Sequence, residues 1–151
     1  LSFNQEKNGD RARAHTIIFK DFAHAPSKLK ATSTAVKDQF DNRTLVACIE
    51  LHTFSSLNKD FIGQYDGTFD SPDEALVFIN PSTVAAKGLE MISEEEIKSA
   101  FQRADIKLFT DAETLEKHLL TQKWEAKNLL LMSSGNYGGL DLQKIKNSIL
   151  K

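Results

Sequence analysis

Two polar side chains that follow the first apolar run of the chain could bind a ligand. Residues 16–19 are apolar except for one threonine, Asp21 and His24 follow them, and Pro26 then suits the first turn of a helix. In an open α/β sheet, ligands bind in the crevice beyond the carboxyl ends of the strands. There, Asp21 could accept hydrogen bonds from a ribose hydroxyl, and His24 could donate to a ribose or phosphate oxygen. The alternatives are a turn or helix-capping role for Asp21 and a plain surface position for His24.

A glycine-rich segment, residues 133–139 (Ser-Ser-Gly-Asn-Tyr-Gly-Gly), is the second candidate. It follows the apolar run 129–132 and precedes the closing helix, where free backbone N–H groups favour anions. Glycines also let the backbone approach a ligand closely. The segment matches neither G-x-x-x-x-G-K-[ST] nor G-x-G-x-x-G, so neither nucleotide fingerprint is met. We expect a ligand-facing loop at the same edge as Asp21.

A third polar segment, residues 50–53 (Glu-Leu-His-Thr), follows the apolar run 45–49 and should reach this edge too, unless it is a solvated loop. His15 and His118 fall on a predicted strand and a predicted helix, where we expect structural roles. The sequence has no histidine or cysteine pair at metal-ligand spacing and no G-x-S-x-G elbow. We therefore predict neither a metal centre nor a serine hydrolase.

The elements that must position these segments alternate between strand and helix. Continuous apolar runs at 45–49, 75–79 and 129–132 are typical of strands covered on both faces, as in parallel sheets. Residues 1–19 read as a hairpin with its turn at 8–10 (Asn-Gly-Asp). The fold class is thus a three-layer, Rossmann-like α/β sandwich with a mainly parallel sheet and an antiparallel N-terminal hairpin edge.

Helices are expected between these strands. Capping boxes at Ser93/Glu96 and Thr110/Glu113 open two of them. The remaining expected elements are a helix from Pro26 to about Phe40, a short helix within 58–65, a short strand at 107–109, and a closing helix with Leu142, Ile145 and Ile149 on one face.

The composition indicates an ordinary domain of a reducing compartment. The chain has 151 residues and a net charge of −2 with interspersed signs, which gives no electrostatic footprint for nucleic acid or a membrane surface. No apolar stretch approaches the roughly 20 residues of a membrane span. Cys48, the single cysteine, lies in an apolar run, so we expect it to be buried, with no disulfide and a cytoplasmic location.

Two segments carry a resemblance to a known family. Residues 20–26 (Lys-Asp-Phe-Ala-His-Ala-Pro) resemble the D-[YF]-A-H-x-P segment that opens the C-terminal domain of the Mur ligases, the ATP-dependent amide ligases of peptidoglycan assembly. Residues 132–140 resemble the closing segment of the murein peptide ligase branch, which acts in peptidoglycan recycling. The resemblance covers essentially the whole chain, and it implies that residues 1–151 are a single C-terminal domain excised from a three-domain enzyme.

The resemblance also implies an activity. The parent enzyme would use ATP and Mg²⁺ to join the tripeptide L-Ala-γ-D-Glu-meso-diaminopimelate to UDP-N-acetylmuramate through an acyl phosphate. The magnesium ligands and catalytic groups would lie in the middle domain, so the isolated domain would be inactive. Asp21 and His24 would bind the nucleotide. The residues that would face the peptide are His52, Ser134, Gly135 and Asn136.

The chain departs from the family at three places. Lys20 stands where many relatives have aspartate, Ala25 where they have a second histidine, and residues 52–56 where they usually carry arginine. Two other hypotheses therefore stay open. One is the same domain of the L-alanine-adding ligase or of a folylpolyglutamate-synthase-like relative. The other is a non-catalytic Rossmann-like binding module.

Overall fold

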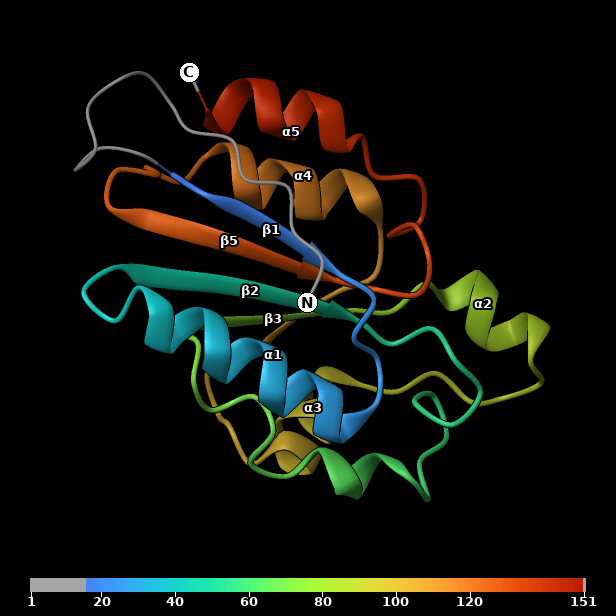
Figure 1. Ribbon diagram of the computed structural model, residues 1–151. Coiled ribbons are helices and arrows are strands. Elements are labelled where there is room, and N and C mark those ends of the chain that lie inside the picture. Colours follow the sequence, from blue (N-terminus) through green and yellow to red (C-terminus); the bar gives the residue numbers. More distant parts are fainter. Residues whose placement is uncertain (1–15, 151) are drawn as a thin grey trace.

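Five parallel strands form the centre of the molecule, in the order β1-β5-β2-β3-β4 (Figure 1). The computed structural model describes residues 16–150, and the strand count refers to this range. Each pair of neighbouring strands runs parallel. The strands are β1 (Ile18–Asp21), β2 (Thr44–Glu50), β3 (Glu74–Phe78), β4 (Lys107–Phe109) and β5 (Lys127–Met132).

The expected N-terminal hairpin falls largely on residues 1–15, which lie outside the described residues. Its second strand is present as β1, which pairs parallel to β5 with Ile18 opposite Leu129. The sheet of residues 16–150 is therefore parallel throughout, and the predicted α/β architecture is confirmed for this part of the chain.

Helices cover both faces of the sheet (Figure 1). The helices α1 (Pro26–Gln39) and α3 (Glu94–Phe101), with the short 3-10 helix η2 (Ile62–Tyr65), pack on one face, while α4 (Ala112–Leu120) and α5 (Leu142–Ile149) pack on the other. Strand β2 shows the division: Ala47 and Ile49 join the core under α1, and Val46 and Cys48 join the core under α4 and α5. Alternate residues of a strand point to opposite faces, so β2 is apolar on both sides.

Helix starts follow local capping chemistry, with one correction. The box at Ser93 and Glu96 is confirmed, since each side chain bonds the backbone of the other residue. The predicted box at Thr110 and Glu113 is wrong: Asp111 is the N-cap of α4, and its carboxylate accepts from the backbone N–H of Thr114 at 2.7 Å. An aspartate next to the threonine caps at least as well, and its position moves the helix start by one residue.

The helix α2 (Pro81–Ala86) was not expected. It begins where Asn80 accepts a hydrogen bond from the N–H of Ser82, with Pro81 in the first turn. The Asn-Pro pair after β3 is itself a helix-start signal in the sequence.

The single cysteine, Cys48, is buried in β2 as predicted. Burial raises the pKa of its thiol far above the usual range.

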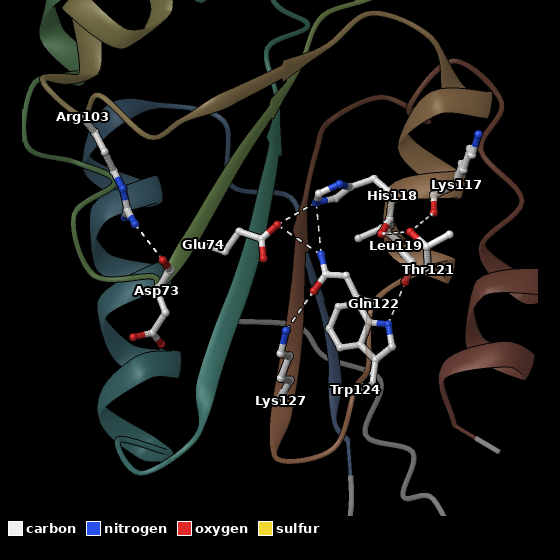
Figure 2. A network of polar contacts seen from close by, with 10 residues as sticks. All are labelled: Asp73, Glu74, Arg103, Lys117, His118, Leu119, Thr121, Gln122, Trp124 and Lys127. Carbon is white, nitrogen blue, oxygen red and sulfur yellow. Dashed lines mark hydrogen bonds and ion pairs between the residues drawn. The ribbon is translucent and has the colours of Figure 1, made fainter.

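A polar network links α4 to the amino ends of strands β3 and β5 (Figure 2). His118 Nε2 lies 2.7 Å from Glu74 Oε1, and the amide of Gln122 donates to the same oxygen at 3.1 Å. Lys127 Nζ in turn donates to Gln122 Oε1 at 3.2 Å. Glu74 and Lys127 begin β3 and β5, so this network lies at the opposite end of the strands from Asp21. His118 therefore has the structural role expected of it.

We expect acid to weaken the fold through carboxylates such as Asp73. Burial raises its pKa, but hydrogen bonds from Lys37 Nζ and the N–H of Leu45, both 2.8 Å, outweigh burial and leave the pKa lowered. A carboxyl with a depressed folded pKa adds stability above its unfolded pKa and loses it as the pH falls through the folded pKa. The free energy of unfolding, measured by urea titration, should therefore decrease below about pH 4.

Two variants separate Asp73 from the general effect of acid. Asp73→Asn should lower the free energy of unfolding at neutral pH and flatten its acid dependence. Asp41→Asn, at an exposed position in the turn after α1, should leave the acid dependence unchanged. Identical acid curves for the wild type and Asp73→Asn would contradict the assignment.

Candidate functional site

A pocket of about 350 Å³ lies at the carboxyl ends of β1 and β5. Strand β1 leads into α1 on one face of the sheet, whereas β5 leads into α5 on the other. Neighbouring strands whose connections leave on opposite faces create a crevice, which is where ligands bind in open parallel sheets. Its walls come from two segments: residues 20–22 at the carboxyl end of β1, and residues between 131 and 142, from the end of β5 to the start of α5. The residues lining it are Lys20, Asp21, Phe22, Leu131, Ser133, Gly135, Asn136, Tyr137, Leu140 and Leu142.

Asp21 forms one wall of the pocket and is held by the chain around it. Its Oδ1 accepts from the N–H of Phe22 and its Oδ2 from the hydroxyl of Thr32, each at 2.9 Å. It does not cap α1, because the N-cap is Ala25. An ionised carboxylate has about four acceptor sites, so Asp21 can accept further hydrogen bonds from a ligand in the pocket.

His24 does not line the pocket. Its ring is exposed, and its Nδ1 donates to the carbonyl oxygen of Phe22 at 3.0 Å. Tyr65 anchors the turn between β1 and α1, because its hydroxyl donates to the carbonyl oxygen of His24 at 2.6 Å. Burial, opposed by a hydrogen bond with Ser56, raises the pKa of Tyr65 to about 12, so this hydroxyl stays a donor at neutral pH. Phe22 is 73% exposed at the rim of the pocket.

The glycine-rich loop forms the opposite wall through Gly135, Asn136 and Tyr137. Tyr137 is buried, and its hydroxyl lies within donating distance of the carbonyl oxygens of Met132 (2.6 Å) and Cys48 (2.9 Å). Burial raises its pKa well above the usual range, so the hydroxyl keeps its proton. Gly138 has a φ of +64°, a backbone conformation that favours glycine. The Tyr137 side chain therefore anchors the loop to β2 and β5.

Glu50 lies buried beneath the loop, and the sequence analysis did not single it out as a site residue. Its Oε1 accepts from the hydroxyl of Ser133 and from the N–H of Tyr137, the latter at 2.9 Å. The Ser133 hydroxyl oxygen also accepts from the N–H of Gly135 at 2.7 Å. A carboxylate that ends an otherwise apolar strand is the signal that could have found it, because such a group is rarely buried without partners.

The structure brings together only part of the expected site. Asp21, Gly135 and Asn136 line the pocket. His52 instead lies beside Gly135, on the side of the loop that faces Glu50, and its Nδ1 is 3.7 Å from Glu50 Oε2. The Ser134 hydroxyl oxygen is buried and has no hydrogen-bond partner among the described residues.

Within residues 16–150 no group of three or more histidine, cysteine, aspartate or glutamate side chains could hold a metal ion. No helix in this part of the chain is both long and apolar enough to cross a membrane.

Comparison with known proteins supports a single fold family, although no protein-family model matches the chain. Over 61 residues it is 39% identical to a UDP-N-acetylmuramate–L-alanine ligase of Sulfurihydrogenibium, a match that spans 40% of this chain and 13% of that ligase. The crystal structure of a murein peptide ligase from Psychrobacter arcticus matches with a TM-score of 0.70 and 19% identity, over 99% of this chain and 29% of that one. A UDP-N-acetylmuramate–alanine ligase from Thermotoga maritima matches with a TM-score of 0.63 and 15% identity, over 99% and 29%.

These likenesses carry different weight. The structural matches extend over nearly the whole chain and establish its fold, while the sequence match is closer but local. In each case the chain corresponds to less than a third of the longer protein. The all-parallel sheet and the structural matches agree, and the chain has the fold of the Mur ligase C-terminal domains.

Proposed function

We propose that the chain is the ATP- and peptide-binding C-terminal domain of a peptidoglycan-recycling amide ligase. The full enzyme would join L-Ala-γ-D-Glu-meso-diaminopimelate to UDP-N-acetylmuramate in the cytoplasm. The observation that supports this most is the pocket at the carboxyl ends of β1 and β5, which has the Asp21 carboxylate on one wall and the glycine-rich loop on the other. Carboxylate acceptors and closely approachable backbone fit a nucleoside and a polar peptide better than they fit an apolar ligand.

In this reaction the domain contributes binding and orientation. ATP would convert the muramyl carboxylate to an acyl phosphate, which the amine of the tripeptide then attacks. Asp21 would hold the ribose, and the segment around Gly135 and Asn136, backed by His52, would hold the incoming peptide. Mg²⁺ would be held by the middle domain. Correct placement of two reactants and exclusion of water lower such a barrier without any proton transfer by this domain.

A second candidate is the corresponding domain of the L-alanine-adding ligase. The 39% identity over 61 residues to such an enzyme favours it, whereas the resemblance of residues 132–140 to the murein peptide ligase branch favours recycling. The pocket suits both, because the two reactions share ATP and UDP-N-acetylmuramate. They differ only in the size of the amine substrate.

We expect the full-length enzyme to release ADP in the presence of UDP-N-acetylmuramate and the tripeptide, and not with L-alanine. The measurement is a coupled ADP assay with each amine offered separately, and a reaction without UDP-N-acetylmuramate is the control. Turnover with L-alanine alone would replace recycling by the biosynthetic reaction. A protein that binds ATP but releases no ADP with either amine would overturn both and leave a binding module.

A further inference from the structure

We propose that Glu50 is a positioning residue of this site, which holds the loop 133–137 and the ring of His52 in the arrangement that receives the amine substrate. This inference rests on the proposed function, and it adds a role for Glu50 that the proposed function itself does not include. Glu50 itself is 1% exposed and does not line the pocket, so it would act through its neighbours.

The carboxylate of Glu50 is the point to which the loop is attached. A carboxylate buried without hydrogen bonds costs far more free energy than a buried neutral polar group, so the donors to Glu50 are essential. Both donors to Oε1 come from the loop: the hydroxyl of Ser133 and the N–H of Tyr137. Because Ser133 also accepts from the N–H of Gly135, three of the five residues from 133 to 137 are fixed by one side chain of β2.

Close packing couples the same carboxylate to the residue that lines the pocket. A Cβ atom on Gly135 would lie 2.9 Å from Glu50 Oε1 and 3.0 Å from His52 Nδ1. The backbone of the loop therefore rests directly on the Glu50 and His52 side chains. A shift of either side chain toward the loop must move Gly135, and with it Asn136.

The His52 ring lies between the buried carboxylate of Glu50 and the solvent. Its side chain is 37% exposed while that of Glu50 is 2% exposed, and its Nδ1 faces Glu50 Oε2 at 3.7 Å. That nitrogen has no hydrogen-bond partner among the described residues. The carboxylate of Glu50 thus lies behind the His52 ring, whose Nδ1 faces inward and whose other edge is open.

The test is Glu50→Gln in the full-length ligase. The amide oxygen can still accept from Ser133 and Tyr137, but the charge facing His52 is lost. We expect the KM for the amine substrate to rise about tenfold, as for one lost charge-assisted contact. The KM for ATP should change less than about twofold, because Asp21 lies on the other wall and makes no contact with Glu50. Hydrogen exchange at Gly135 and Tyr137 should become faster.

Glu74→Gln is the matched control. It makes the same change at the start of the neighbouring strand β3, where Glu74 bonds His118 and Gln122 at the opposite edge of the sheet. If Glu50 only stabilised the fold, both variants would lower the unfolding temperature and neither would change the ratio of the two KM values. We expect Glu74→Gln to lower the unfolding temperature and to leave both KM values unchanged.

The two levels of the proposal fail in different ways. An active ligase whose Glu50→Gln variant keeps the wild-type KM for the amine substrate would overturn the positioning role and leave the proposed function intact. A folded wild-type ligase that is inactive with both amines would overturn the proposed function, and the role of Glu50 with it.

Discussion

In the proposed full-length ligase, Asp21→Ala should raise the KM for ATP by about 10- to 100-fold and change the KM for the peptide much less. The variant removes the carboxylate that lines the pocket and that we assign to the ribose. A hydrogen bond to a charged group contributes about 1.5–3 kcal/mol, which corresponds to this range. The measurement is steady-state ADP release with each substrate varied in turn.

The control for Asp21→Ala must distinguish the loss of a ligand contact from the loss of the hydrogen bonds that Asp21 makes within the domain. Thr32→Val removes the hydroxyl that donates to Asp21 Oδ2 but leaves the carboxylate in the pocket. We expect this variant to lower the unfolding temperature slightly and to keep the KM for ATP within about twofold. An unchanged KM for ATP in Asp21→Ala would remove this residue from the nucleotide site.

Gly135→Ala should lower kcat/KM for the amine substrate by more than about tenfold. The added methyl group would lie 2.9 Å from Glu50 Oε1, a distance at which one of the two must move. Glu50 is buried and bonded to the loop, so the loop itself has to shift. Overpacking of this kind costs about 1–3 kcal/mol, and a comparable displacement at the pocket wall would misplace the substrate.

Gly63→Ala provides the comparison. Gly63 lies in η2, has no positive φ, and has no atom within 4 Å of an added Cβ. Alanine there should leave activity unchanged and keep or slightly raise the unfolding temperature. Wild-type kinetics in Gly135→Ala would show that the loop does not contact the substrate.

The strands, and the segments at their carboxyl ends that line the pocket, could be predicted from sequence because each depends on local pattern. The apolar run ending at Met132 and the start of a helix at Pro26 are examples in which neighbouring residues decide the structure. The cap of α4 was misplaced because Thr110 and Asp111 are adjacent and both can cap. Here the competing signals were local too, and the stronger capping residue decided the start.

The interior of the site could not be predicted in this way. Glu50 and Ser133 are 83 positions apart, and nothing in either segment shows that one will donate to the other. His52 was expected to face the peptide, yet its contact with Gly135 depends on the register of β2 against β5, in which Ile49 lies opposite Met132. Only the assembled sheet brings such pairs together.

The position of β5 in the middle of the sheet has a consequence for how the domain forms during synthesis. Strand β5 is inserted between β1 and β2, so β1 has no partner in the described sheet until residues 127–132 have been made. The bond from the N–H of Ile17 to Asn128 spans 111 positions, and contacts of such long range slow folding. Because the two walls of the pocket lie at the carboxyl ends of β1 and β5, a nascent chain that stops short of Met132 lacks one wall of the pocket. A ligand bound in this pocket would therefore stabilise the complete domain and not a partly synthesised chain.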